Sequence, residues 1–399
     1  MTGYILDWLN LIFRWAHLIA GISWIGASFY FVWIDDSLRT DVSDEDTARG
    51  IHGKLWSVHG GGFYHNQKYM TGPRGEPLST DLHWFYWEAY STWITGMAML
   101  AIIYWAGAST FLIDPAVLAL TPPEAIAISI GVLIVGWFVY DGLCRVFEDN
   151  PVALWTSICV VLLAADYGLF HVFGGRGAYI HVGAIVGTIM VANVFFIIIP
   201  GQRRVVASLR AGQPPDTRPG KLGKMRSVHN TYFTLPVLFM MISNHYPMTY
   251  GSSWGWLILA LISAAGVLVR RFFLLSHKHK LVVALPVTAA VILAVAGIII
   301  VPHPQPAAAG APAPTWAQVQ PILAQRCAVC HGAHPTEAGF TAPPEGVLLD
   351  NPTSAHANAS RIEQQAVTTH AMPLGNITGI TDAERATLGA WIAAGAPIP

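Results

Sequence analysis

Eight apolar runs, each long enough to cross a lipid bilayer as a helix, occupy the first three quarters of the chain. They cover residues 9–34, 88–107, 124–143, 152–173, 179–200, 229–246, 252–274 and 281–302. About 20 apolar residues span the hydrocarbon core of a bilayer, where a helix satisfies all of its own backbone polar groups. The sixth run is the weakest, because Pro236, Asn244 and His245 interrupt it. The sequence therefore predicts an all-α fold, with a polytopic membrane helical bundle of about eight spans over residues 1–302.

The composition agrees with a membrane protein. Of the 399 residues, 53% are hydrophobic and only 11% are charged, whereas soluble domains carry about 25% charged residues. The net charge of −1 argues against nucleic acid as a partner. The first run lies close to the N-terminus without a basic segment before it, so we expect a retained span and not a cleaved signal peptide.

The basic residues give the predicted bundle an orientation. Seventeen of the 22 Lys and Arg lie in loop 35–87, in the turn at Arg145, in 201–228 and in 270–280. The alternate connections 108–123, 174–178 and 247–251 contain only Arg176. Loops rich in Lys and Arg stay in the cytoplasm. We therefore expect a multi-pass protein of the bacterial inner membrane, with both termini in the periplasm.

The motif Cys327-Ala328-Val329-Cys330-His331 is the attachment pattern of a c-type haem. Two thiols bind the porphyrin vinyl groups, and the following imidazole ligates the iron. A zinc or redox Cys-x-x-Cys is the alternative, but the two other cysteines, Cys144 and Cys159, lie in apolar runs and complete no zinc site. The motif predicts one covalent haem c, which is attached outside the bacterial cytoplasm, in agreement with the charge count.

A Pro/Ala-rich linker over 303–314 separates the bundle from a predicted small class I-like cytochrome c domain at 315–399. Thr315 is suited to cap a helix that ends on the haem motif, and Thr381-x-x-Glu384 is a capping box that opens the last helix. Between them, Met372 precedes Pro373 in a loop, where small cytochromes c present the sixth iron ligand. A thioether opposite a proximal His raises the haem potential. Packing of Met372, with ligation by His370, His334 or His356, is the alternative.

Several histidines are expected at membrane depth, where ionisable groups are functional candidates. In the first span Arg14 and His17 are three residues apart, so they share a helix face. A haem b held by two imidazoles needs histidines at equal depth. Pairs of His17 with His181, His171 or His245 are conceivable, and the sequence does not choose among them. Histidines hydrogen-bonded between helices or in contact with interfacial water are the alternative.

The loop that contains Trp56-Ser57-Val58-His59-Gly60-Gly61-Gly62-Phe63-Tyr64-His65-Asn66-Gln67-Lys68 is unusual for a cytoplasmic connection. A glycine-rich turn flanked by aromatic, amide and imidazole groups can sandwich a flat polar ring. It is not a phosphate loop, since the G-x-x-x-x-G-K-S/T spacing is missing. An amphipathic stretch on the membrane surface, with Trp and Tyr in the interfacial belt, is the alternative.

Taken together, these segments resemble a known family. They are RWAHLIAGISWIGASFYF, VHGGGFYHNQKY, HWFYWEAYSTWITG, HVGAIVGTIMVANVFFIIIPGQR, SVHNTYFTLPVLFMMISNHYP, CAVCH and AMPLGNITGITDAER. The whole chain is similar to the membrane-bound, cytochrome c-linked urate oxidases. The resemblance implies oxidation of urate to 5-hydroxyisourate, with electrons passing to the fused haem c and then to a cytochrome or terminal oxidase. Hydrogen peroxide would not be made.

Under this hypothesis a general base acts on urate or water, and polar side chains hold the urate oxygens. The candidate bases are His59, His65 and His229; the candidate substrate contacts are Arg14, Gln67, Lys68 and Asn230. A cytoplasmic urate site would require electrons to cross about 30 Å of hydrocarbon, which favours a haem b relay or a pocket deep in the bundle. Two rival functions stay open: a quinol-linked haem b/c electron-transfer protein without an organic substrate pocket, and a transporter or sensor with a haem-regulated bundle.

Overall fold

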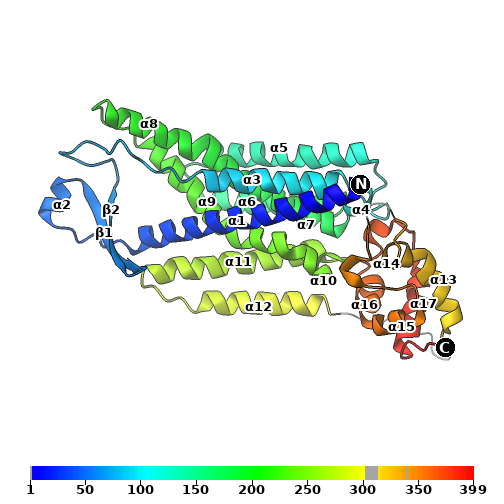
Figure 1. Cartoon of the computed structure of the whole chain (residues 1–399). Helices are drawn as coiled ribbons and strands as arrows, with labels where there is room; N and C mark the ends of the chain where they lie inside the picture. Colours follow the sequence, from blue (N-terminus) through cyan, green and yellow to red (C-terminus); the bar gives the residue numbers. More distant parts are fainter. Residues whose placement is uncertain (1, 302–312, 338–339) are drawn as a thin grey trace.

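The computed structural model describes residues 2–301, 313–337 and 340–399, and most of them are helical (Figure 1). Helices lie at all eight apolar runs and form one elongated bundle (Figure 1). In chain order they are α1 (Thr2–Ser37), α3 (Trp87–Met99) with the π-helix η1 (Leu100–Trp105), α5 (Pro122–Val146), α6 (Pro151–Leu169), α7 (Gly175–Ala192) with the π-helix η2 (Asn193–Ile198) and α8 (Ile199–Arg210), α9 (Arg218–Ile242), α11 (Gly255–His277) and α12 (Ala284–Ile299). Short elements α4 (Ala108–Phe111), η3 (Ser243–His245) and α10 (Pro247–Tyr250) lie in the connections.

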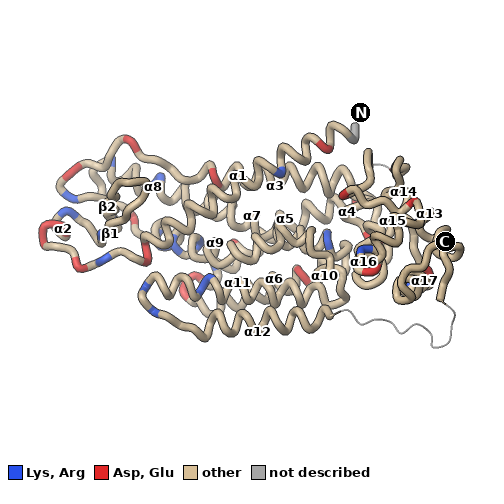
Figure 2. The backbone as a smooth tube through the Cα atoms, turned by 60° about the horizontal axis from the view of Figure 1, so that its bottom comes forward, with Lys and Arg blue, Asp and Glu red and all other residues tan. Residues whose placement is uncertain are grey.

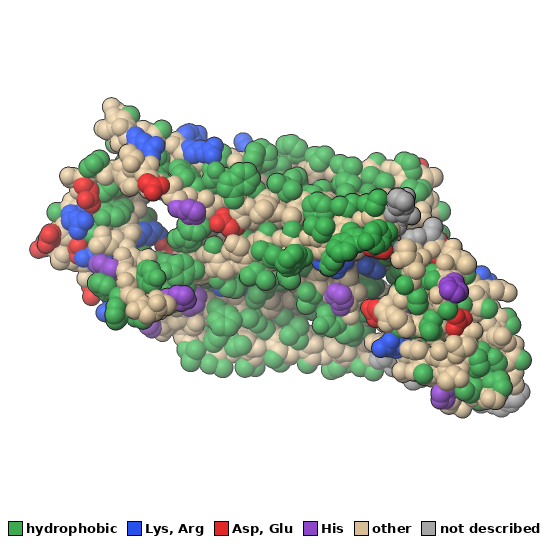
Figure 3. Space-filling view, viewed as in Figure 1, with side chains coloured by type: hydrophobic (Ala, Val, Ile, Leu, Met, Phe, Trp, Pro, Cys, Tyr) green, Lys and Arg blue, Asp and Glu red, His purple; other side chains and the backbone are tan. Residues whose placement is uncertain are grey.

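Among the described residues, five helices are long and apolar enough to cross a membrane, namely Tyr4–Ser37, Pro122–Val146, Pro151–Leu169, Gly175–Arg210 and Gly255–His277. Large apolar side chains on their outer faces remain uncovered, for example Ile134 and Phe138 of α5 at 52% and 68% exposure. Figure 3 shows such side chains across the middle of the face of the bundle that it presents. Exposed apolar surface on this scale indicates a contact with lipid or another apolar partner, so the fold is compatible with a membrane location.

Charged residues gather at one end of the bundle (Figure 2). This end, called here the basic end, carries loop 35–87, Arg145, the segment 201–228 and the segment 270–280. The opposite end, called here the junction end, lies against the C-terminal segment 313–399 (Figure 1). The basic residues counted in the sequence therefore share one end, because the helices run antiparallel between short connections.

The prediction of an all-α fold is wrong for the loop after α1. Residues 51–69 form an antiparallel hairpin of β1 (Ile51–His59) and β2 (Gly62–Tyr69), preceded by α2 (Asp44–Ala48). Gly60 and Gly61 have φ of 59° and 81°, and a two-residue turn with two positive φ values matches the right-handed twist of a hairpin. Gly60 and Gly61 are thus accounted for by backbone conformation, and aromatic residues in both segments favour strands.

The C-terminal segment has a hydrophobic core of its own, centred on Trp391, Leu388, Val319 and Leu323. Its elements are α13 (Trp316–Arg326), α14 (Ala328–His331), η4 (Pro344–Gly346), α15 (Pro352–Ala357), α16 (Ala359–Ile362), the π-helix η5 (Glu363–Thr368), η6 (Leu374–Asn376) and α17 (Asp382–Ala393). The capping boxes expected at Thr315 and Thr381 are both present. Most of the predicted linker 303–314 lies outside the described residues.

Candidate functional site

The Cys-x-x-Cys-His motif forms the short helix α14, with Cys327 as its N-cap. The His331 ring nitrogen Nδ1 lies 3.0 Å from the Val347 carbonyl oxygen. A carbonyl accepts only from a protonated Nδ1, so Nε2 carries the lone pair that an iron atom needs. Burial raises the pKa of the Cys327 thiol to about 12, whereas a redox-active pair needs a lowered thiol pKa. The donor set therefore fits covalent haem attachment better than dithiol chemistry.

The candidate sixth ligands lie in different surroundings. Met372 packs, together with Cys327, against the core of the C-terminal segment, and its carbonyl accepts a hydrogen bond from Arg385 Nη1 at 2.8 Å. His370 is exposed, and so is His334. His356 is bonded through Nδ1 to the Ala396 carbonyl at 2.8 Å. Met372 therefore lies in the same hydrophobic cluster as Cys327 of the motif.

The segment 369–375, called here the Met372 loop, joins the two halves of the molecule. Ala371 packs against the core of the bundle, while its neighbour Met372 packs against the core of the C-terminal segment. Glycines permit this close approach: a Cβ on Gly375 would come within 2.6 Å of the Ile113 carbonyl oxygen, and one on Gly251 within 2.9 Å of the Thr369 Cβ. The loop that carries the candidate iron ligand is therefore in direct contact with the bundle.

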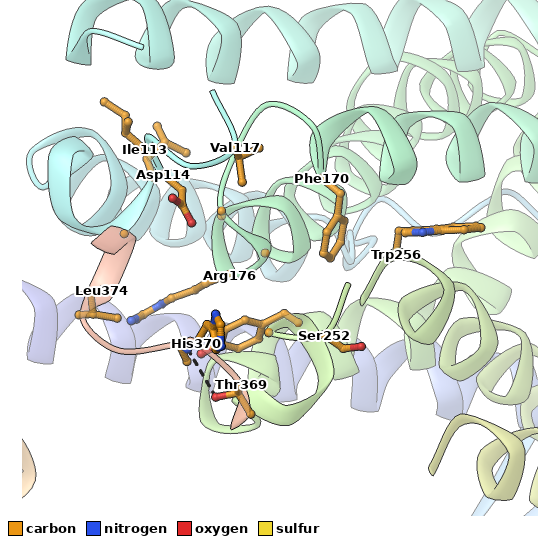
Figure 4. A pocket seen from close by; sticks show the side chains of 18 of the residues that line it. Ile113, Asp114, Val117, Phe170, Arg176, Ser252, Trp256, Thr369, His370 and Leu374 are labelled. Atoms are coloured by element: carbon orange, nitrogen blue, oxygen red, sulfur yellow. Dashed lines mark hydrogen bonds between the residues drawn. The ribbon is translucent and has the colours of Figure 1, made fainter. Parts of the chain in front are cut away.

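A cavity of about 630 Å³ lies at this contact. The Met372 loop supplies one wall, and the connection after η1, the start of α7 and the segment before α11 supply the others (Figure 4). Aromatic side chains from α6, α10 and α11 line it, namely Tyr167, Phe170, Tyr250 and Trp256. Figure 4 shows the Arg176 side chain reaching from α7 toward the Met372 loop, past Asp114.

The electrostatics of the cavity are set by helix ends and by Arg176. Two long helices, α7 and α11, begin at its wall, and neither has a side-chain cap or an acidic residue in its first turn. Arg176 is half-buried, with Nε 3.4 Å from the Tyr104 hydroxyl and its guanidinium carbon 5.0 Å from the centroid of the Phe111 ring. It has no ion pair among the described residues. The Asp114 carboxylate also lines the cavity, beside the start of α7, so the cavity is suited to a ligand that carries negative charge for Arg176 and the helix ends and N–H donors for Asp114.

A second polar cluster lies inside the bundle, toward the basic end. His229 Nδ1 lies 2.7 Å from the Tyr140 hydroxyl, and Asn230 accepts from Asn193 at 2.9 Å. Arg226 bonds Asp141 at 2.6 Å and is 3% exposed. These groups are bonded mainly to one another, which is the usual condition of buried polar side chains. The structure thus brings the predicted residues His229 and Asn230 together in one buried network, in which Arg226 Nε has no hydrogen-bond partner among the described residues.

The candidate residues of the β1–β2 hairpin make none of their hydrogen bonds or ion pairs with that buried network. His59 is exposed beside the hairpin turn, and His65 stacks on Trp56 with ring centroids 4.2 Å apart. Gln67 accepts a hydrogen bond from Tyr69, and Lys68 forms an ion pair with Asp35. Cross-strand pairing therefore accounts for the aromatic and imidazole groups that suggested a ring-binding sandwich.

His17 and its possible partners lie at different depths along α3 and η1. His17 Nδ1 is 2.9 Å from the Thr92 carbonyl oxygen, whereas the His181 ring lies 6.2 Å from that of Tyr104. Along α3 and η1, His17 and His181 are therefore offset by roughly 12 to 18 Å, at a rise of 1.5 Å per residue. His181 is fully buried with both nitrogens hydrogen-bonded, Nε2 to the Ser129 hydroxyl at 2.6 Å and Nδ1 to the Gly177 carbonyl at 2.7 Å.

The other two candidates lie near the junction end. His245 follows Asn244, whose Oδ1 accepts from Tyr104 at 3.2 Å, and His171 lines the cavity. Neither shares the depth of His17, so the residues present do not fit a haem b held between His17 and any of the three. Arg14 donates a hydrogen bond to Asn10 at 3.2 Å.

The Urate oxidase N-terminal family model matches residues 3–301. The chain belongs to this family. The match covers about three quarters of the chain and all eight apolar runs. It supports an enzyme of the urate oxidase type, as the resemblance of the membrane segments predicted. No curated protein and no solved structure matches the chain.

Within this family member, sequence reasoning missed the residues that shape the cavity. Asp114 and Arg176 lie in short connections that the charge count treated only as gaps between basic loops. One signal was present: Arg176 is the single basic residue in the connections at the junction end. Tyr140, Asn193 and Arg226 were missed for a different reason, because only the packing of α5, η2 and α9 brings them to His229.

Proposed function

We propose that the chain oxidises urate to 5-hydroxyisourate and passes the electrons to a c-type haem on its own C-terminal segment. Urate gains the oxygen of one water molecule and releases two electrons and two protons in this reaction. Cys327 and Cys330 would hold the haem covalently, and His331 and Met372 would ligate its iron. The bound haem supplies a one-electron acceptor, so each urate requires two transfers and a downstream cytochrome or terminal oxidase to remove the electrons.

The observation that carries the proposal is the position of the Met372 loop. Its neighbouring side chains Ala371 and Met372 pack on the two different cores, so the candidate iron ligand is one residue from the urate oxidase part. Such a contact is what an internal electron acceptor requires. Because the electrons leave through this route and not directly to oxygen, hydrogen peroxide is not a product.

The membrane setting follows from the same arrangement. Five apolar helices of sufficient length and the segregation of basic residues to one end favour a bacterial inner membrane protein with the C-terminal segment in the periplasm. We propose eight spans for the bundle and a cytochrome c domain for the segment 315–399.

An anaerobic difference spectrum of the purified protein tests the proposal. Urate should reduce the c-type haem without oxygen and without added mediator, and 5-hydroxyisourate should appear with two electrons released per urate. In air with the downstream acceptor present, hydrogen peroxide should not accumulate. A haem c that stays oxidised with urate but is reduced by quinol would reject urate oxidation and select the electron-transfer alternative.

A further inference from the structure

We propose that the cavity at the junction is the urate site, and that Arg176 with the N-termini of α7 and α11 binds the substrate as a planar purine anion. This inference rests on the proposed function and adds the location and the recognition chemistry. The sequence alone favoured a site among the histidines of the basic half, so the inference also moves the chemistry to the opposite end of the bundle.

The size and walls of the cavity suit a flat heteroaromatic ring. Its volume of about 630 Å³ lies within the range of small-molecule pockets, about 300–1,000 Å³, and leaves room for urate with the water that reacts with it. Phe170 and Trp256 present aromatic side chains from α6 and α11 along one side (Figure 4). Aromatic faces bind a flat ring by stacking.

The charge of the cavity suits the ionised form of urate. Urate loses one ring proton in weakly acidic solution, and it is a monoanion at neutral pH. The guanidinium of Arg176 can bind two acceptors of a planar anion side by side. Gly175, Arg176 and Gly177 at the start of α7 line the cavity, and α7 has no side-chain cap, so the cavity lies at the positive end of an 18-residue helix.

The cavity also offers an acceptor for the ring N–H groups. The Asp114 carboxylate lies beside the start of α7, with Oδ2 3.6 Å from the Cβ position of Gly174. It also accepts a hydrogen bond from the Ala116 amide at 3.0 Å. Carbonyl oxygens and ring N–H groups alternate along the edge of urate. A site with donors from Arg176 and α7 and an acceptor from Asp114 matches this pattern of acceptors and donors.

The location also removes a difficulty of electron transfer. A urate site at the basic end would place the substrate about a bilayer thickness from a haem on the C-terminal segment, roughly 30 Å. The cavity wall, in contrast, includes Thr369, His370, Ala371 and Leu374 of the Met372 loop. Electrons released there reach the acceptor across this loop, and no second haem inside the bundle is required.

The test separates binding from turnover. Urate is titrated into wild-type protein and into Arg176→Gln and Arg176→Lys, each held fully reduced so that no oxidation occurs, and the affinity is measured by calorimetry. Loss of a charge-assisted hydrogen bond inside a pocket should weaken binding by about 10- to 100-fold in Arg176→Gln. Arg176→Lys keeps the positive charge but loses the planar guanidinium, so its affinity for urate should lie between those of wild type and Arg176→Gln.

Matched controls are Arg204→Gln, an exposed arginine of α8, and Arg226→Gln in the buried cluster. The thermal unfolding curve of each variant in detergent shows whether the bundle has folded, and the amount of attached haem c shows that the C-terminal segment has. Urate affinity within twofold of wild type in both Arg176 variants would overturn the inference, and so would a loss confined to Arg226→Gln. A shifted haem potential in Arg176→Gln with unchanged urate affinity would also overturn it, by assigning Arg176 to the haem propionates.

These outcomes are distinct from failure of the proposed function. If urate does not reduce haem c in the wild-type protein, urate oxidation through the haem is wrong. If urate reduces the haem normally in wild type and in both Arg176 variants, only the location is wrong.

Discussion

The contact between the bundle and the Met372 loop can be opened by a single methyl group at Gly251. This residue has φ of −79° and ψ of −6°, so alanine fits its backbone without conformational strain. An added Cβ would lie 2.9 Å from the Thr369 Cβ and closer still to the Thr369 carbonyl oxygen, whereas ordinary contact begins at 3.4 Å and extends to 4 Å. The loop must therefore withdraw by about half an ångström to one ångström.

A displacement of this size is large for a reaction that depends on position. Misplacement of reacting groups by about 1 Å can lower a rate by 10²-fold, so we expect Gly251→Ala to slow urate-dependent haem reduction by about 10- to 100-fold. The haem itself should remain attached, because its cysteines and His331 lie in α13 and α14, away from Gly251. The two halves of the protein should each keep their own core.

The assay is the anaerobic rate of haem c reduction after rapid mixing with urate. Gly223→Ala in α9 is the matched control, since a Cβ at Gly223 meets nothing within 4 Å. Reduction by a small artificial donor should be equal in both variants, which shows that the haem is intact. A wild-type rate with urate in Gly251→Ala would refute the reasoning that the contact at Thr369 sets the path of the electrons.

Three further predictions follow from the same contacts. Met372→Ala should keep the covalent haem but lower its midpoint potential in a potentiometric titration, because thioether ligation raises the potential; an unchanged potential would favour one of the histidines as ligand. His229→Gln should lower the free energy of unfolding by about 1–3 kcal/mol, seen as a lower melting temperature in detergent, because it disturbs a buried hydrogen bond to Tyr140. His59→Gln at the exposed hairpin turn should change the free energy of unfolding by less than about 0.5 kcal/mol. If one of these variants is as stable as wild type but no longer oxidises urate, the substituted histidine is the general base. Hydrogen bonds from the Thr381 amide and hydroxyl and from Arg326 hold the pKa of Glu384 below its ordinary value of 4.5. The ionised carboxylate therefore stabilises the folded protein fully above pH 4.5, and this stabilisation is lost as the pH falls through the lower pKa of the folded state. Glu384→Gln should reduce the acid-induced loss of stability in thermal unfolding curves, and curves identical to wild type would contradict the role of the capping box.

The hairpin and the histidines show where sequence reasoning failed. Three consecutive glycines beside aromatic residues suggested a ring-binding loop, but the positive φ of Gly60 and Gly61 shows that the turn requires them for backbone conformation. The depth of His17 relative to His181 depends on the vertical offset of α1 and α7 against α3. Such offsets arise from side-chain packing between helices, and a residue's position within its own run does not reveal them.

The sequence by itself determined the apolar helices and the charged end of the bundle, and it predicted haem attachment from one motif. Each of these features can be predicted from a local pattern, namely a run of apolar residues, a count of Lys and Arg, or the spacing Cys327-x-x-Cys330-His331. Only the tertiary structure decided that Arg176, Asp114 and the Met372 loop surround one cavity. These residues are far apart in the chain, and they meet because close glycine contacts hold the end of the bundle against the C-terminal segment.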